Sequence, residues 1–182
     1  DLGCGSGLMT LALCRMFKEI KVTSFEIQKQ LYQVAERNIQ INNLSRQVTL
    51  IFGDLRDKQI RLADNSCDLI VSNPPFRQNL TGKVSPNELL RKANHELNGT
   101  LGDFIRVGAI ALKHKGIFAL TMIPERLPEL LSLMSEYHVE AFNLKMIHHR
   151  ADNDASAVLV LGRKGGRGGL KINPPVYIDS PG

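Results

Sequence analysis

The chain has 182 residues, of which 43% are hydrophobic, so it can bury the core of one ordinary domain but not of several. No apolar run approaches the roughly 18 to 20 residues of a membrane-spanning helix, and the sequence therefore predicts no such helix. The formal charge of +5 is compatible with a nucleic-acid partner without requiring one. The three cysteines, Cys4, Cys14 and Cys67, lack CxxC or metal-site spacing, which predicts reduced thiols, no bound metal and a cytoplasmic location.

Helices and strands alternate along the first 72 residues. The glycine-rich turn DLGCGSG opens the chain and leads into an apolar stretch of helical character. The segments that follow have either strand composition or apolar residues at helical spacing. The sequence predicts helices at 8–17 and 28–43 and strands at 21–27, 47–52 and 67–72.

The alternation resumes after a polar segment, 77–98, which is predicted as a long loop of the kind that is usually functional or disordered. Residues 163–182 are dense in glycine, proline and basic residues. We expect them to form a C-terminal tail of the same domain, with the catalytic part at 1–162. Between loop and tail, the sequence predicts helices at 101–113 and 125–137 and strands at 116–123, 139–147 and 155–162, the last two as antiparallel neighbours.

Strands that alternate with helices predict a parallel α/β sheet with helices on both faces, and such sheets bind ligands beyond the carboxyl ends of their strands. Four polar features fall at predicted strand ends: DLGCGSG, Glu26, Gly53–Asp54 and NPPF. A glycine turn before a helix normally follows a strand, yet only Asp1 and Leu2 precede this one. We therefore expect an N-terminally truncated fragment that lacks its central first strand and is poorly stable in isolation.

The glycine turn predicts a ligand without phosphates. Gly3, Gly5 and Gly7 form a G-x-G-x-G run, whereas the dinucleotide fingerprint G-x-G-x-x-G would need glycine where Leu8 stands. Glycines permit a tight turn and the close approach of a ligand. The carboxylate of Asp1, at the head of the turn, suits a ligand with a cationic amino group.

Two further carboxylates predict an adenosine group beside that amino group. Glu26 lies at the end of the predicted strand 21–27, where a carboxylate can accept hydrogen bonds from both ribose hydroxyls. Asp54 follows the next strand and is placed to accept one from an adenine amino group. S-adenosylmethionine combines an adenosine, an ammonium group and no phosphate, so it is the predicted cofactor.

The stretch SNPPF predicts a rigid shelf at the end of a buried strand. Proline has a fixed φ and no N–H, so Pro74 and Pro75 end the strand that 67–72 forms. An exocyclic amine on a nucleobase is a poor nucleophile, because its lone pair is delocalised into the ring. Acceptors on its hydrogens, the Asn73 side-chain oxygen and the Pro74 carbonyl, would favour the geometry of attack. Phe76 would stack on the base.

These residues carry a family resemblance. DLGCGSG, Glu26, GD and NPPF resemble the motifs of class I S-adenosylmethionine-dependent methyltransferases of the amino-methylating branch, which implies a Rossmann-like sheet. The stretches LGDFIRVGAIALKHKGIFALTMIPERLPELL and HHRADNDASAVLVLGRKGGRGGLKINPPVYI are similar to the bacterial tRNA adenine-N6 methyltransferase family, which acts on an anticodon-loop adenine of a valine tRNA. The GRKGG-x-x-GLK-x-x-PP pattern is the most specific part of the match.

The resemblance implies roles for matching residues. The implied catalytic residues are Asn73, Pro74, Pro75 and Phe76. The implied cofactor-binding residues are Asp1, Gly3, Gly5, Gly7, Glu26, Ile27, Asp54, Leu55 and Asn73. The implied partner is RNA, in particular a tRNA anticodon loop, with Arg163, Lys164, Arg167 and Lys171 as phosphate contacts.

Three alternatives stay open from the sequence. Phe76 stands where adenine-directed relatives commonly carry tyrosine, and NPPF also resembles the motif of ribosomal RNA guanine-N2 methyltransferases. Glutamine-amide methyltransferases of translation factors also use an NPP shelf, because an amide nitrogen poses the same lone-pair problem. A third alternative is a binding module that keeps the fold without the activity.

Overall fold

The computed structural model describes residues 1–74 and 99–179, and its first part confirms the predicted alternation of helices and strands. All five elements predicted before residue 75 are present, with ends that differ by at most two residues from the predicted ones. They are α1 (Leu8–Met16), β1 (Val22–Glu26), α2 (Lys29–Ile41), β2 (Val48–Phe52) and β3 (Cys67–Ser72). The predicted loop at 77–98 lies outside the described residues.

The second part contains every predicted element and one more strand. Its elements are α4 (Leu101–Ala111), β4 (Leu112–Met122), the short 3-10 helix η1 (Pro124–Arg126), α5 (Leu127–Glu136), β5 (Val139–His148), β6 (Ala155–Lys164) and β7 (Lys171–Tyr177). The helix predicted to reach Lys113 ends earlier because Leu112 turns to an extended conformation, is fully buried and pairs with Cys67 of β3.

The additional strand, β7, corrects the prediction that everything after residue 162 is a tail. Lys171–Tyr177 pairs in parallel with β5 at the end of the sheet. The consecutive Pro174 and Pro175 argue against a strand in the sequence, because proline cannot donate to a ladder. The strand is possible here because β7 is an edge strand, and the register shift between Lys145 and Ile147 accommodates the two prolines.

One residue links the two groups of strands. The strand order is β1-β2 in one group and β3-β4-β6-β5-β7 in the other. Leu2 makes parallel bridges to Phe25 of β1 and to Ser72 of β3, and its backbone N–H donates to the Val71 carbonyl at 3.0 Å. β6 is antiparallel to both its neighbours, while the other pairs are parallel, so the carboxyl ends of the remaining strands lie along one edge.

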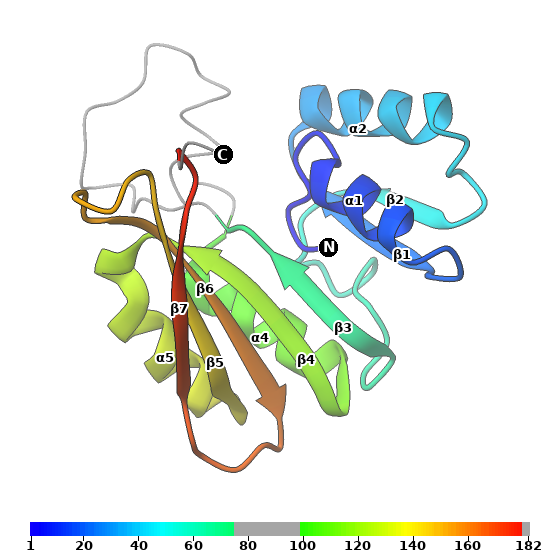
Figure 1. The fold of residues 1–182 in the computed structure, drawn as a ribbon. Coiled ribbons are helices and arrows are strands. Elements are labelled where there is room, and N and C mark those ends of the chain that lie inside the picture. The colour runs from blue at the N-terminus through cyan, green and yellow to red at the C-terminus, as the bar shows by residue number, and fades with distance from the viewer. Residues whose placement is uncertain (75–98, 180–182) are drawn as a thin grey trace.

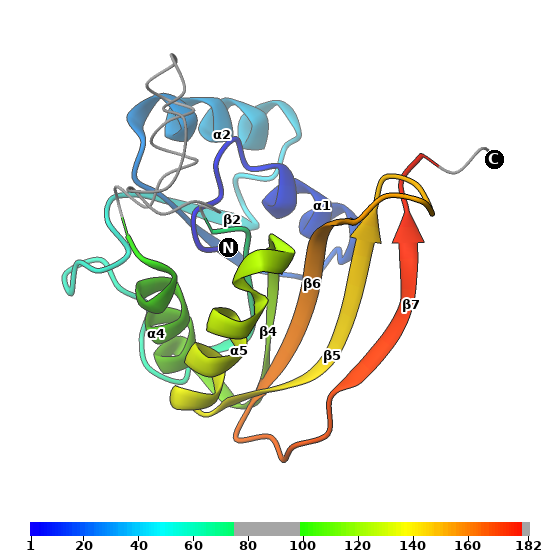
Figure 2. The ribbon, with the colours of Figure 1, turned by 90° about the vertical axis from the view of Figure 1, so that its left-hand side faces the viewer.

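Helices cover both faces of the sheet, as the sequence predicts. Figure 2 shows α1 on one side of the strands and α4 and α5 on the other. The alternation within β1 agrees, because Ser24 contacts Thr10 of α1 whereas the neighbouring Phe25 belongs to the core cluster under α4. A smaller cluster of Cys14, Val22, Ile39 and Val48 holds α1 and α2 on β1 and β2.

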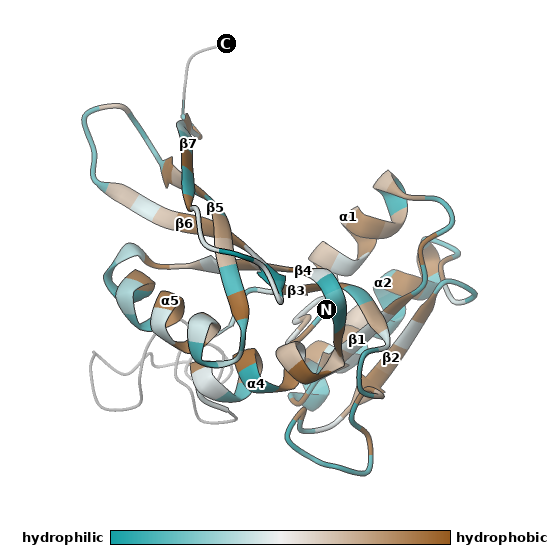
Figure 3. Cartoon of the chain, turned by 90° about the horizontal axis from the view of Figure 1, so that it is seen from below, coloured by the Kyte–Doolittle hydropathy of each residue, from teal (hydrophilic) through white to brown (hydrophobic). Residues whose placement is uncertain are grey.

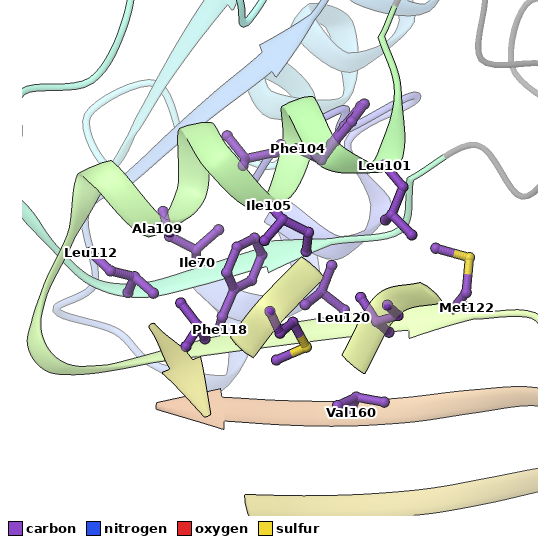
Figure 4. Packing of buried hydrophobic residues seen from close by; sticks show 14 of the residues in the cluster. Ile70, Leu101, Phe104, Ile105, Ala109, Leu112, Phe118, Leu120, Met122 and Val160 are labelled. Atoms are coloured by element: carbon purple, nitrogen blue, oxygen red, sulfur yellow. The ribbon is translucent and has the colours of Figure 1, made fainter. Parts of the chain in front are cut away.

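The main core lies between α4, α5 and the larger group of strands (Figure 4). Phe118, Leu120 and Met122 alternate along β4 and point to this core, and none of the three is exposed to solvent. In Figure 3 apolar colouring runs through β4 and α1, while several of the connecting loops are hydrophilic. None of the helices within 1–74 and 99–179 is long and apolar enough to cross a membrane.

Candidate cofactor and substrate site at the carboxyl ends of the strands

The glycine turn lies across the carboxyl ends of β1 and β3. The Cys4 N–H donates to the Phe25 carbonyl at 2.8 Å, and Ser72 Oγ donates to the Leu2 carbonyl at 2.7 Å. Gly3, Gly5 and Gly7 have φ values of 75°, 58° and 83°, in the left-handed region that favours glycine.

Each glycine of this turn has a different neighbourhood. A Cβ on Gly3 would lie 3.1 Å from the Phe104 ring of α4, and one on Gly7 would lie 3.3 Å from Ala35 Cβ of α2. A Cβ on Gly5 would meet no atom of the described residues within 4 Å. The middle of the turn therefore borders open space that a ligand can enter.

Glu26 fastens the turn to the end of β1. Its Oε2 accepts a hydrogen bond from the Gly5 N–H and its Oε1 one from the Gln28 N–H, both at 2.8 Å, and the residue is only 4% exposed. Each carboxylate oxygen keeps a second acceptor site. The carboxylate predicted to accept the ribose is thus held next to Gly5, at the open middle of the turn.

Asp1 has one carboxylate oxygen fixed and one free. Oδ2 accepts from Thr10 Oγ1 at 2.8 Å, and Thr10 Oγ1 also lies 2.7 Å from Ser24 Oγ. Oδ1 is buried and has no hydrogen-bond partner among the described residues. A buried acceptor without a donor costs about 1–3 kcal/mol. An ammonium group would supply that donor, so Asp1 fits the amino acid end of S-adenosylmethionine.

Cys4, inside the turn, is not a candidate nucleophile. Burial, with the nearby charge of Glu26, raises the pKa of its thiol to about 12. At neutral pH the thiol is therefore protonated, and only the thiolate is strongly nucleophilic. All three cysteines are free, in agreement with the predicted reduced thiols.

The end of β2 adjoins the turn through Glu26. The Gly53 N–H donates to the Glu26 carbonyl at 3.0 Å, and the predicted adenine acceptor Asp54 follows it. In the structure Arg56 binds both oxygens of the Asp54 carboxylate at 2.5–3.0 Å, and these hydrogen bonds lower the pKa of Asp54. Leu55 is buried in the main core rather than exposed at the site.

The substrate shelf is described only in part. Asn73, directly after β3, is exposed, while Pro74 is buried. Because Ser72 bonds to Leu2, the shelf begins next to the glycine turn. Pro75 and Phe76 lie outside the described residues. Ile27, predicted to bind the cofactor, is half-buried after Glu26.

Three site residues escape the sequence analysis: Thr10, Ser24 and Gln28. Gln28 is 9% exposed, and its Oε1 is buried without a partner in the described part of the chain. A polar residue inside the apolar run LMTLALC was the available signal for Thr10. Its meaning depends on a contact with β1 that only the folded chain displays.

The basic residues predicted to contact phosphate lie away from this site. Arg163 and Lys164 end β6, the antiparallel strand, so they lie at the opposite end of the sheet from Ser72. Figure 1 shows the turn between β6 and β7 at the bottom of the molecule, whereas the N-terminus lies in its upper half. Lys164 Nζ donates to Asn65 Oδ1 at 3.0 Å and to the Leu112 carbonyl at 2.8 Å, and so has a structural role.

Comparisons with known proteins agree with this geometry. The model of the methyltransferase small domain family matches residues 1–125. The tRNA1(Val) (adenine(37)-N6)-methyltransferase of Porphyromonas gingivalis is 26% identical over 161 residues, 87% of this chain and 62% of that protein. The ribosomal RNA small subunit methyltransferase C of Actinobacillus pleuropneumoniae is 31% identical over 101 residues, 54% of this chain and 28% of that protein.

A solved structure described as a predicted O-methyltransferase from Agrobacterium tumefaciens has a TM-score of 0.77 at 21% identity, over 98% of this chain and 78% of that one. This likeness shows the class I, Rossmann-like fold. The chain spans less than two thirds of the length of the curated relatives it matches. Its cofactor is S-adenosylmethionine. The family model matches residues 1–125, and the glycine turn, Glu26 and Asn73 lie at one edge of the sheet. The chain therefore belongs to the methyltransferase small domain family.

Proposed function

We propose that this protein transfers the methyl group of S-adenosylmethionine to the N6 amine of an adenine in tRNA. The observation that carries the proposal is the exposed Asn73 at the end of β3, beside the glycine turn that would hold the cofactor. The tRNA adenine-N6 methyltransferase that aligns with 87% of this chain supports adenine as the target. We place the protein in a cytoplasmic, reducing compartment, in keeping with its free thiols.

The residues of the site divide the work of binding and orientation. Asp1 would accept a hydrogen bond from the ammonium group of the cofactor, and Glu26 would accept hydrogen bonds from its ribose. Gly3, Gly5 and Gly7 would allow the cofactor to approach the backbone closely. Asp54 would accept a hydrogen bond from the adenine amino group. This requires the Arg56 side chain to turn away from one oxygen of the Asp54 carboxylate. Ile27 would flank the adenine with apolar surface, whereas the side chain of Leu55 is buried in the main core.

When bound, the cofactor supplies an electrophilic methyl group on a sulfonium. Asn73 Oδ1 and the Pro74 carbonyl would each accept a hydrogen bond from the target amine. These two bonds would direct the lone pair of the amine at the methyl group. In the transfer, the amine nitrogen would bond to the methyl carbon as the C–S bond broke with its electron pair left on sulfur, and the amine would release one proton to water. Holding the reacting atoms in line contributes by proximity.

RNA fits this site because a loop base is already unpaired. A duplex base would have to be extruded first, at a cost of a few kcal/mol. An anticodon-loop base could enter the shelf without that cost. Phe76, outside the described residues, would stack on it, a contact worth about 1–3 kcal/mol in single-strand binding.

The test of the substrate is to incubate the purified protein with isotopically labelled S-adenosylmethionine and, in separate reactions, unmodified total tRNA or unmodified ribosomal RNA, and to identify the labelled nucleoside by mass spectrometry. Label in N6-methyladenosine is expected. Label in N2-methylguanosine would favour the second candidate, which rests on Phe76 and on the ribosomal RNA methyltransferase that aligns with 54% of this chain. No label in tRNA or ribosomal RNA would contradict both and point to protein glutamine amides.

The test of the shelf is Asn73→Ala. Loss of an acceptor that acts on developing charge should lower the rate of methyl transfer by about 10²–10³-fold. The affinity for S-adenosylhomocysteine, measured by calorimetry, should stay within about threefold, because Asn73 holds substrate rather than the cofactor's far end. Asn42→Ala, at the exposed end of α2, is the matched control and should alter neither quantity. Unchanged turnover in Asn73→Ala would refute the role of the shelf.

A further inference from the structure

Gln28 carries a buried amide that the fold does not use. It is 9% exposed and stands at the start of α2 with φ −87° and ψ 114°, but its side chain makes no capping hydrogen bond. Its Oε1 is inaccessible to solvent and has no hydrogen-bond partner within 1–74 and 99–179. A buried carbonyl oxygen without a partner is a candidate acceptor for a donor from a bound molecule when it lies next to a ligand site.

The position of Gln28 points to the ribose of the cofactor. Its backbone N–H donates to Glu26 Oε1, so the residue begins where the predicted ribose acceptor ends. Both oxygens of Glu26 already accept one backbone N–H, from Gly5 and from Gln28. A ribose presents two neighbouring hydroxyl donors. Half of the acceptor sites of the Glu26 carboxylate are occupied, and Gln28 Oε1 is a second acceptor next to the end of β1.

We propose that Gln28 Oε1 accepts a hydrogen bond from one ribose hydroxyl of S-adenosylmethionine, so that Glu26 and Gln28 hold the two hydroxyls between them. The orphan oxygen gains its donor only in the complex, which makes Gln28 a residue for cofactor affinity rather than for folding. This inference rests on the cofactor half of the proposed function and is independent of the methylated substrate.

The test compares two glutamines, the buried Gln28 and the half-buried Gln47, whose Oε1 atoms are both buried and lack partners in the described part of the chain. Gln28→Met replaces the amide at the proposed site. Gln47→Met replaces an amide just before Val48, the first residue of β2, at the end of that strand remote from the site. The probes are S-adenosylhomocysteine and its 2′-deoxy and 3′-deoxy analogues, with affinities from calorimetry. Gln28→Met should bind S-adenosylhomocysteine about 5- to 10-fold more weakly than the wild type does, whereas Gln47→Met should bind it equally well.

One deoxy analogue should identify the hydroxyl. The wild type should bind the analogue without the partner hydroxyl about 5- to 10-fold more weakly than S-adenosylhomocysteine, and Gln28→Met should bind that analogue as the wild type does. An unchanged affinity of Gln28→Met for S-adenosylhomocysteine would overturn the inference. So would an equal loss for all three probes, because that is the pattern of a general distortion.

Thermal unfolding supplies a second readout. Without ligand, Gln28→Met should unfold at the same temperature as the wild type or higher, because an unpaired buried acceptor is replaced by an apolar chain of similar shape. Saturating S-adenosylhomocysteine should then raise its unfolding temperature by less. A lower unfolding temperature without ligand would show a folding role and contradict the proposal. Failure of tRNA methylation with normal probe binding would instead contradict only the proposed substrate.

Discussion

At the scale of single residues, the site depends on how Asp1 is held. Thr10 fixes one oxygen of its carboxylate, Ser24 fixes Thr10, and the other oxygen is left without a partner in the described chain. Thr10 and Ser24 are fully buried, so solvent water does not compete for the hydrogen bonds between them and Asp1. The threonine hydroxyl therefore sets the direction in which Asp1 presents its free oxygen, and Thr10 is a positioning residue.

Thr10→Val should weaken the binding of S-adenosylhomocysteine by about 10-fold, because Asp1 loses the donor that orients it. The affinity for 5′-methylthioadenosine, which has no ammonium group, should change by less than about twofold. Calorimetry with both ligands gives the ratio of the two losses. Thr10→Ser keeps the hydroxyl and should restore the wild-type ratio. Equal losses for both ligands would mean that Thr10 only supports the fold.

At the scale of elements, α4 connects the site to the core. Its Phe104 ring lies beside Gly3 of the turn, and its Gly108 lets the helix approach the sheet. A Cβ on Gly108 would lie 2.4 Å from the Phe118 ring of β4. The same helix carries a second glycine, Gly102, whose nearest neighbours would be 3.6 Å away.

The two glycines should therefore respond to alanine with opposite signs. Gly108→Ala should lower the free energy of unfolding by about 1–3 kcal/mol, because overpacking outweighs the gain in helix propensity. Gly102→Ala should raise it by up to about 1 kcal/mol, because only the propensity changes. Urea unfolding measures both. Stabilisation by Gly108→Ala would show that α4 can move away from β4.

The start of α4 should make stability depend on pH. Thr100 and Asp103 form a reciprocal capping box. Burial raises the pKa of Asp103, but hydrogen bonds from Thr100 and Arg106 outweigh it and hold the pKa below its ordinary value of 3.8. A lowered folded-state pKa stabilises the protein above pH 3.8, and this stabilisation is lost as the pH falls through the folded value.

Asp103→Ala should thus lower the free energy of unfolding by about 1 kcal/mol at pH 7. The difference from the wild type should shrink at pH 3, where urea unfolding provides the comparison. Asp68→Ala is the control, since that side chain is 84% exposed and its pair with Lys113 should contribute less than about 1 kcal/mol at either pH. A deficit in Asp103→Ala that is the same at both pH values would contradict the charge-dependent cap.

At the scale of the whole molecule, strand direction separates the site from the basic turn. Because β6 runs against its neighbours, its last residues and the turn to β7 lie at the end of the sheet remote from Asn73. Of the four predicted phosphate contacts, Lys164 bonds within the fold and Arg163 stacks on Phe142, with 4.6 Å from guanidinium to ring centre. Arg167 and Lys171 are thus the two predicted residues that could contact the phosphates of an RNA long enough to reach this turn.

The double substitution Arg167→Ala and Lys171→Ala should therefore distinguish RNAs by size. With a short anticodon stem-loop, the KM for methyl transfer should equal that of the wild type. With whole tRNA, the slope of log affinity against log salt should become shallower by about 1–2, the number of phosphate contacts removed. Equal salt slopes for both proteins with whole tRNA would show that this turn does not contact RNA.

The sequence predicts what depends on neighbours in the chain. The elements from α1 to β6 follow from apolar periodicity, and Glu26 and Asn73 follow from their places at strand ends. Thr10 and Gln28 could not be predicted in the same way, because their roles depend on contacts with Asp1 and with Glu26 in the folded chain. β7 was missed because Pro174 and Pro175 forbid a central strand, and nothing local reveals that this strand lies at an edge.

The same prolines affect how copies of the molecule meet. An open sheet edge presents a row of backbone donors and acceptors on which a strand of another molecule can assemble, which is a common start of aggregation. At Pro174 and Pro175 the outermost strand has no N–H to offer over two consecutive residues, and its register is shifted. Growth of the sheet from one molecule into the next is therefore interrupted at β7.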